Sequence, residues 1–251
     1  MSKTLRVIIL AVVAATLMSI MSACSSAEKN ASNNTPEGAF ATAEEFDKGE
    51  RYEEAIRHYT DVKNKFPYSN YAAKAELAIA DVHYKQESYA EAQVSYQMFK
   101  DMHPSHPRID YVQFRIAMSD YNQLPTSIDR DLSLANDTIL AFSDLLRKYP
   151  SSEYAAEATE KRTATIHMMA EKEEYIADFY YKHEIWLSAL GRYENLYKNY
   201  GSLGFDKKAL ARVVYCAEKL NQKEKAKKYA DILEEKFPGS SEAKKAEKEI
   251  Q

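Results

Sequence analysis

The sequence has few residues that interrupt helices or cross-link a chain. Of its 251 residues, 6 are glycine and 7 are proline, which is too few for a fold rich in strands and turns. Its two cysteines are Cys24 and Cys216, so modification of the first would leave an exported domain held by packing alone. A formal net charge of −4 gives no electrostatic basis for binding nucleic acid.

Catalytic motifs are also missing. The sequence contains no glycine-rich phosphate loop, no H-E-x-x-H and no G-x-S-x-G. His103 and His106 are close enough in sequence to suggest a metal site, but the prolines around them and the lack of a nearby cysteine favour a rigid loop. We therefore expect no catalytic residues, no metal and no dissociable cofactor, and interpret the chain as a binding protein and not an enzyme.

The N-terminus has the pattern of an export signal. Lys3 and Arg6 precede an apolar run that is too short to span a membrane, and Met-Ser-Ala-Cys follows it. This last segment resembles the lipobox of bacterial lipoproteins, which predicts a signal peptide over residues 1–23. Cys24 then carries a diacylglycerol and an acyl chain (palmitate). The alternative is a plain cleaved signal in which Cys24 is incidental.

Residues 24–38 are small and polar and show no apolar periodicity, which predicts a flexible tether between anchor and domain. Ser25 is not the aspartate that commonly retains such lipoproteins in the inner membrane. By that resemblance the expected location is the periplasmic face of the outer membrane, with the lipid as the membrane anchor.

From residue 39 onward a repeat is visible. Small residues recur twelve positions apart and are followed, twelve positions later, by a proline or glycine that ends a helix. Because only small side chains allow two helices to approach closely, each unit reads as a pair of crossing helices. The pairs of small residues are Ala43 and Ala55, Ala80 and Ala92, Ala177 and Ala189, and Val214 and Ala226, with Thr138 in the irregular third unit.

This repeat pattern predicts an all-α fold, an α-solenoid of about five helix-turn-helix repeats of tetratricopeptide (TPR) type in residues 39–251. A loop at 124–131 interrupts the third repeat, the fourth opens with one long helix over 153–182, and a charged, fraying helix ends the chain. The expected repeats are 39–67, 71–104, 109–150, 153–201 and 205–238.

Two residues in these helices have alternative interpretations. Glu173 falls on the apolar stripe of the long helix, beside Ile166 and Met169, where a lone carboxylate suggests acid–base chemistry but a structural ion pair is commoner. Cys216 lies among apolar helical residues, which favours a buried small hydrophobe over a reactive thiol.

Several segments resemble the BamD family, the lipoproteins of the outer-membrane β-barrel assembly machinery. The most specific is HPRIDY, from His106 to Tyr111. The runs AFSDLLRKYPSSEY and WLSALGRYENLYKNY also resemble segments of this family. The similarity extends over the whole mature chain. Arg115-Ile116-Ala117 lacks a glycine that the family often has, and Gly201 stands in place of a proline.

The resemblance implies a scaffold that binds the POTRA domains of a BamA-like barrel protein, other assembly lipoproteins and unfolded outer-membrane proteins. It implies Arg192, Trp186 and Glu173 as candidate partner contacts in the C-terminal repeats. The implied client groove in the N-terminal repeats is lined by Phe40, Leu77, Asp81, Tyr84, Tyr111 and Phe114. A solvated Arg192 and a packed Tyr111 ring are the plainer interpretations.

A second function class remains open from the sequence. Another outer-membrane TPR lipoprotein, such as a pilotin or a cell-division coordinator, has the same anchor and fold. The HPRIDY segment favours the assembly scaffold, and so do the irregular repeat lengths, because a pilotin-type chain keeps steps nearer to 34 residues.

Overall fold

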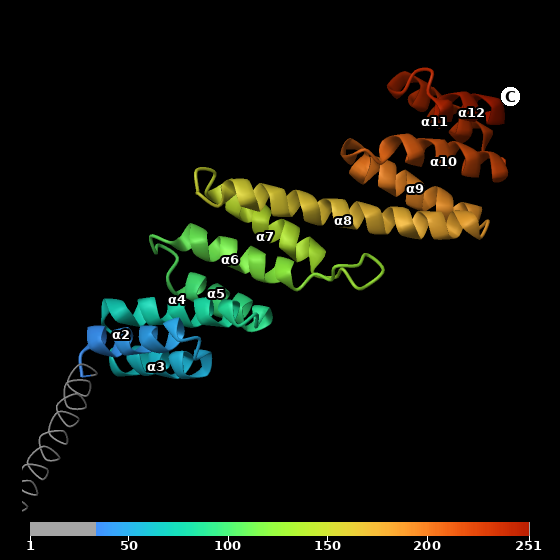
Figure 1. The fold of residues 1–251 in the computed structure, drawn as a ribbon. Coiled ribbons are helices and arrows are strands. Elements are labelled where there is room, and N and C mark those ends of the chain that lie inside the picture. Colours follow the sequence, from blue (N-terminus) through green and yellow to red (C-terminus); the bar gives the residue numbers. More distant parts are fainter. Residues whose placement is uncertain (1–33, 251) are drawn as a thin grey trace, which may run out of the picture. The chain divides into compact units, whose positions relative to one another are not determined.

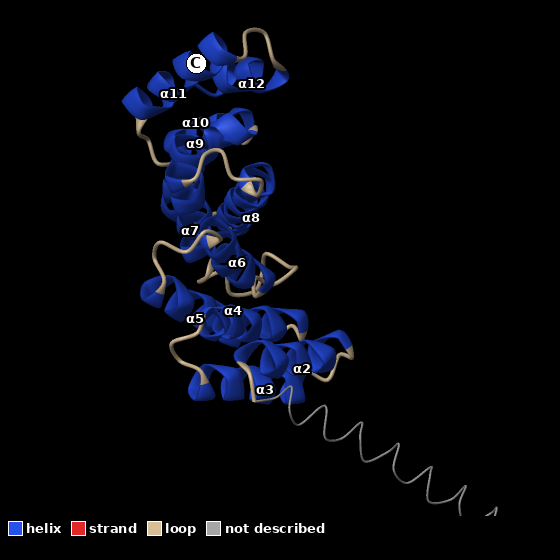
Figure 2. Ribbon diagram, turned by 90° about the vertical axis from the view of Figure 1, so that its left-hand side faces the viewer, coloured by secondary structure: helices blue, strands red, loops and turns tan. Residues whose placement is uncertain are grey.

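The structure is a computed structural model that describes residues 34–250. Within that range it contains eleven α-helices, one 3₁₀ turn and no strand (Figure 2), so the expected all-α fold is confirmed. The signal peptide, Cys24 and residues 25–33 of the tether lie outside the described residues. The chain forms two compact units, which meet in sequence after Ser119, and each is described by itself.

The N-terminal unit is built from antiparallel helix pairs that follow one another along the chain (Figure 1). Its first helix begins at Pro36, three residues before the expected boundary at Ala39, because the hydroxyl of Thr35 accepts a hydrogen bond from the Gly38 amide at 3.1 Å and proline suits the first turn. The helices are α2 (Pro36–Lys48), α3 (Tyr52–Lys65), α4 (Asn70–Lys85), α5 (Tyr89–Met102) and α6 (Ile109–Asn122), the last of which crosses the unit boundary.

The C-terminal unit repeats the same arrangement with helices of unequal length (Figure 1). Its elements are α7 (Ala135–Lys148), α8 (Ala155–Lys182), α9 (Trp186–Tyr200), the 3₁₀ turn η1 (Gly201–Leu203), α10 (Asp206–Lys219), α11 (Lys223–Lys236) and α12 (Ser241–Ile250). The long helix expected over 153–182 is therefore one continuous helix of 28 residues.

The small residues that recur twelve positions apart in the repeat pattern are all inaccessible to solvent. Each has an exposed fraction of 0%, and the large residues that follow them on the second helices are buried as well. Ala177 and Ala189 belong to one core cluster in the C-terminal unit, and Ala43 and Ala55 belong to one in the N-terminal unit. The helices of each pair approach closely where these residues lie, as the spacing predicted.

Four helix hairpins have the same turn conformation, which the spacing of small residues in the sequence did not reveal. Glu50, Glu87, Glu184 and Asn221 each adopt a left-handed conformation, with φ between 57° and 61°. In every case the next residue donates its amide to a carbonyl five positions back, which satisfies the helix end as in a Schellman motif. Asparagine tolerates this conformation well, whereas glutamate adopts it at a small energetic penalty.

Prolines end the second helix of four pairs. The residue before each proline (Phe66, His103, Tyr149 and Phe237) is the helix C-cap, with φ between −128° and −135°. Proline disfavours helical geometry in the residue before it, so the helix stops there. Gly201 differs from the expectation, because it is right-handed at φ −56° and continues into η1, and the left-handed residue is Gly204 at φ 93°.

Two further local expectations need correction. On α8 the buried residues include Thr165 and Ala170, while Ile166 and Met169 are only partly covered, because α8 packs against both α7 and α9 and no single stripe is buried along its whole length. The interruption of the third repeat is longer than 124–131, since α7 begins only at Ala135.

The C-terminal helix α12 also differs from the expected fraying segment. Ala243 and Ala246 are 4% and 5% exposed, and the helix packs against α10 and α11. The hydroxyl of Ser240 accepts the amide of Ala243 at 3.2 Å and caps the first turn. The helix therefore packs on the C-terminal unit through its alanines and turns its charged side chains outward.

Candidate functional site

Two tyrosine hydroxyls share one carboxylate in the N-terminal unit. Asp81 follows the small residue Ala80 on α4, and its Oδ1 atom accepts hydrogen bonds from Tyr96 on α5 and Tyr111 on α6, each at 2.6 Å. Tyr96 is fully buried and Tyr111 is 9% exposed, so both phenols need this acceptor. Burial raises the pKa of Tyr111, and the adjacent carboxylate acts in the same direction. Asp81 thus joins three helices.

Two arginines pack around Tyr111. The Nε atom of Arg115 donates to the Tyr111 hydroxyl at 3.1 Å, and its guanidinium carbon lies 4.4 Å from the centroid of the Tyr84 ring. Arg108, directly before α6, stacks over the Tyr111 ring at 4.1 Å. The Tyr111 hydroxyl therefore donates to Asp81 and accepts from Arg115. Tyr111 is a packed and hydrogen-bonded side chain whose polar atom is already used within the chain.

An open cleft of about 560 Å³ lies beside this network. It combines aromatic and aliphatic surface with cations from α4 and from the loop before α6, a mixture that suits an extended polypeptide more than a small metabolite. The lining residues are Phe40, Glu44, Asp47, Tyr59, Lys74, Leu77, Ala78, Asp81, Lys85, His106, Pro107 and Arg108.

The six residues expected in the client groove do not all reach this cleft. Phe40, Leu77 and Asp81 line it. Tyr111 does not line it but donates a hydrogen bond to Asp81. Tyr84 lies outside the lining, where its ring packs against Tyr89, with centroids 5.2 Å apart. Phe114 is also outside and is 4% exposed, because a helix turns only about one third of its positions toward any one surface.

The C-terminal unit contains the same tyrosine–aspartate pairing. Tyr193 on α9 donates to Asp178 on α8, and the two residues are 15 positions apart, as are Tyr96 and Asp81. Lys208 on α10 completes the group with its Nζ atom 2.7 Å from Asp178. Burial disfavours ionisation of Asp178, but the hydrogen bonds from Lys208 and Tyr193 outweigh it and hold its pKa below the ordinary value.

Arg192 and Glu173 lie together on another face of α8 and α9. The Arg192 Nη1 atom is 2.9 Å from Glu173 Oε2, and Asn195 donates to the other carboxylate oxygen at 3.1 Å. The Glu173 side chain is 11% exposed, whereas that of Arg192 is 44% exposed. Glu173 thus holds a structural ion pair and positions a guanidinium at the surface. Beside it Leu187 is 68% exposed, giving a shallow polar and apolar surface.

Trp186 does not belong to that surface. Its ring packs against Tyr181 and Tyr215, with centroids 5.5 and 5.7 Å away. Both tyrosines line a separate cavity between α8, α10 and α12. The three candidate contacts that the resemblance implied therefore divide into the Arg192–Glu173 pair and an aromatic group containing Trp186.

The remaining candidate residues have structural roles. His103 Nε2 lies 2.6 Å from Glu76 Oε2, and within residues 34–250 no group of three His, Cys, Asp or Glu side chains is arranged to hold a metal.

Cys216 is 0% exposed, and burial raises the pKa of its thiol to about 12, which keeps it protonated and unreactive. No helix in the same range is long and apolar enough to cross a membrane.

Sequence reasoning missed several residues at these sites. Lys74 and Arg108 line the N-terminal cleft, Arg115 donates to Tyr111 beside it, and Asn195 and Lys208 complete the polar groups of the C-terminal unit. The 15-residue spacing between Asp81 and Tyr96 and between Asp178 and Tyr193 was visible in the sequence. The polar partners that α6 and α10 contribute were not visible in the sequence, because they depend on how one helix pair packs on the next.

The chain is similar to proteins of one family. The family model described as outer membrane lipoprotein YfiO matches residues 32–250. The outer membrane protein assembly factor BamD of Neisseria meningitidis (strain Z2491) is 27% identical over 213 residues, which cover 81% of this chain and 80% of that protein. The assembly factor BamD of Xylella fastidiosa (strain 9a5c) is 27% identical over 240 residues, which cover 92% and 82%.

A weaker likeness exists to a solved structure, the TPR2AB domain of yeast Sti1 in a complex. It is 16% identical, covers 87% of this chain and 84% of that one, and has a TM-score of 0.43. This likeness is too low to bear on function.

Replacement of the shared acceptor tests the network in the N-terminal unit. We expect Asp81→Ala to lower the free energy of unfolding by about 2 to 4 kcal/mol, because two buried hydroxyls lose their partner. Asp231→Ala removes an exposed helical aspartate and should change stability by less than about 0.5 kcal/mol. Urea unfolding followed by circular dichroism measures both, and equal effects would show that Asp81 has no special role.

Proposed function

The chain belongs to the YfiO family of outer membrane lipoproteins, and we propose that it is the lipid-anchored scaffold of an outer-membrane protein assembly complex. The match over residues 32–250 is the observation that carries this proposal, because it includes both compact units and not a single TPR pair. Its curated relatives are outer membrane protein assembly factors, which supports a role in the same process. In this role the protein binds polypeptides by surface complementarity and carries out no chemistry.

We propose that Cys24 carries the lipid and that the mature chain faces the periplasm. The lipobox-like segment and the polar residues after it support this anchor. Each buried CH₂ of an acyl chain contributes roughly 0.8 kcal/mol to membrane attachment, so several chains hold a protein stably.

The partner-binding surface that we propose lies around Arg192. Its guanidinium is half-exposed and pairs with Glu173, and Asn195 holds the Glu173 carboxylate in place by a second hydrogen bond. A fixed guanidinium beside the exposed Leu187 presents a cation and an apolar contact to one partner. An acidic residue on a POTRA domain of a BamA-like barrel protein matches this chemistry, and other assembly lipoproteins then bind elsewhere.

For the client-binding site we propose the cleft of the N-terminal unit. Phe40 and Leu77 supply apolar surface, while Lys74 and Arg108 supply donors and positive charge. An unfolded outer-membrane strand alternates apolar and polar side chains, so it offers both kinds of group along its length. The packed network behind Asp81 supports the proposal by giving the cleft a rigid wall.

Removal of the lipidated thiol tests the anchor. We expect Cys24→Ser to move the protein from the membrane fraction to the soluble fraction, because no acyl chains remain to insert. Cys216→Ala is the control, since it replaces a buried small side chain and should leave membrane attachment intact. Fractionation and immunoblotting give the result, and a Cys24→Ser protein still in the membrane fraction would contradict the anchor.

Charge reversal tests the partner-binding surface. We expect Arg192→Glu to weaken binding to a purified POTRA fragment by at least roughly tenfold, measured by calorimetry. The introduced carboxylate would then repel the acidic residue of the POTRA domain. Lys198→Glu, on the same helix and exposed, should have little effect.

A swapped pair separates binding from internal stability. Glu173→Arg combined with Arg192→Glu restores the ion pair but leaves a negative charge at the exposed position. We expect binding to stay weak in this double variant. Recovery of full affinity would mean that Arg192 acts only inside the chain and that the proposed contact is wrong.

Filling the cleft tests client binding. Ala78 lines the cleft and Ala73 does not, although both are half-buried on α4. We expect Ala78→Trp to weaken binding of a labelled peptide of about ten residues with alternating apolar and polar side chains by at least roughly fivefold, while Ala73→Trp leaves it unchanged. Fluorescence anisotropy measures the affinity, and unchanged binding to Ala78→Trp would place clients elsewhere.

A further inference from the structure

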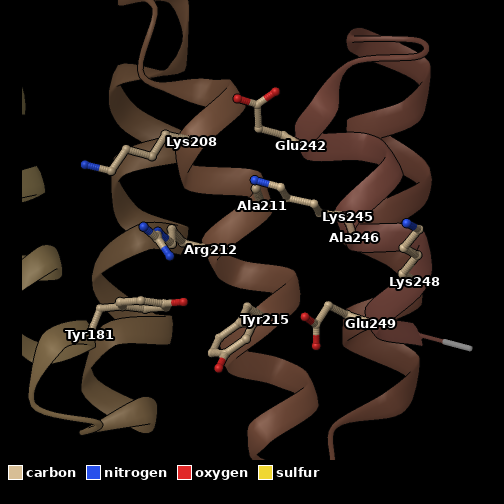
Figure 3. Close-up of a pocket in the computed structure, with 10 residues that line it drawn as sticks. All are labelled: Tyr181, Lys208, Ala211, Arg212, Tyr215, Glu242, Lys245, Ala246, Lys248 and Glu249. Carbon is tan, nitrogen blue, oxygen red and sulfur yellow. The ribbon is translucent and has the colours of Figure 1, made fainter.

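A second cavity, of about 560 Å³, lies within the C-terminal unit between α8, α10 and α12 (Figure 3). Small side chains leave this space open, since Ala211 on α10 and Ala246 on α12 are both part of its lining. Tyr181 and Tyr215 form an aromatic end with ring centroids 5.4 Å apart, and Trp186 packs against both rings. The cavity is separate from the surface around Arg192, with which it shares no lining residue.

The lining has an excess of positive charge. Lys208, Arg212, Lys245 and Lys248 contribute four cations, and Glu242 and Glu249 contribute two carboxylates. Lys208 is already paired with Glu174 at 3.0 Å and Asp178 at 2.7 Å. Among the described residues, no carboxylate lies within 4.0 Å of the charged nitrogens of the other three cations. This is an excess of unpaired cations in a chain whose net charge is −4.

Arg212 is arranged to receive a carboxylate. Its guanidinium carbon lies 4.0 Å from the centroid of the Tyr181 ring, which holds the group flat by a cation–π contact. In Figure 3 it lies between Lys208 and Tyr181, and Lys245 extends from α12 toward the α10 side of the cavity. Arg212 also donates a hydrogen bond to Tyr181, and the remaining N–H groups at the edge of the stacked guanidinium are available to a carboxylate.

The two carboxylates restrict the kind of ligand. Glu242 and Glu249 are seven residues apart on α12, a separation of about 10 Å along the helix axis. A polyanion such as a nucleic acid or an anionic lipid surface meets repulsion from both. A peptide of three extended residues spans about 10 Å, and it can place one carboxylate at Arg212 and one apolar side chain against the tyrosines.

From this arrangement we propose that the cavity between α8, α10 and α12 binds a short extended segment of a partner protein that carries a carboxylate next to an aromatic side chain. Arg212 and Lys245 receive the carboxylate, and Tyr181 and Tyr215 receive the aromatic ring. The site is a second docking point on the C-terminal unit, and it does not depend on the proposed contact at Arg192.

Trp186 provides a direct signal for the test, because it is the single tryptophan of the sequence and touches both lining tyrosines. The probe is an acetylated and amidated tetrapeptide with glycine at each end and aspartate followed by phenylalanine between them. We expect saturable quenching or a spectral shift of Trp186 fluorescence with this peptide. The asparagine analogue should bind at least roughly fivefold more weakly, because it lacks the charge.

Variants locate the response. Arg212→Gln should weaken binding at least roughly fivefold, and Lys207→Gln, an exposed cation on the same helix outside the cavity, should leave it unchanged. Ala211→Leu fills the cavity without altering charge and should also weaken binding. Thermal unfolding by circular dichroism confirms that each variant is folded.

Three results would overturn the proposal. They are equal binding of the aspartate and asparagine peptides, full binding by folded Ala211→Leu, and a Trp186 response to phosphatidylglycerol vesicles without a response to the peptide. The last result would assign the cations to a membrane surface.

Discussion

Ala177 on α8 and Ala189 on α9 have no solvent-exposed surface and belong to one buried cluster. Their small side chains let two helix backbones approach closely, and the same condition recurs at each crossing in both units. Every other feature depends on this approach. It fixes which residues of each helix face inward, and so it fixes which faces remain for binding.

The tyrosine–aspartate pairs show how polar groups are used within that packing. Tyr96 and Tyr193 occupy equivalent positions after the small residue of a second helix, and each donates to an aspartate on the first helix. In both units a third helix then adds a polar partner, through Tyr111 in one and Lys208 in the other. The buried Tyr96, Tyr111 and Tyr193 hydroxyls restrict how these helices pack, because an arrangement that removes their aspartate leaves a buried polar group without a partner.

Two of the proposed binding sites lie where helices from different pairs meet, whereas the surface around Arg192 lies on the single pair α8 and α9. The N-terminal cleft is lined by α2, α3, α4 and the loop before α6, and the cavity of the C-terminal unit by α8, α10 and α12. Neither site belongs to one repeat. Sites of this type can vary in chemistry while the helix crossings stay the same, which suits a scaffold that binds several polypeptides.

The sequence alone determined the helix pairs, the small residues at their crossings, the helix-ending prolines and the buried Cys216, because these depend on local periodicity and on the backbone limits of proline. It also indicated the family through segments such as HPRIDY. Only the tertiary structure decided that Glu173 supports Arg192, that Trp186 packs elsewhere and that Phe114 is buried. Those outcomes depend on how each helix rotates against neighbours far away in sequence, and a repeat spacing does not contain that rotation.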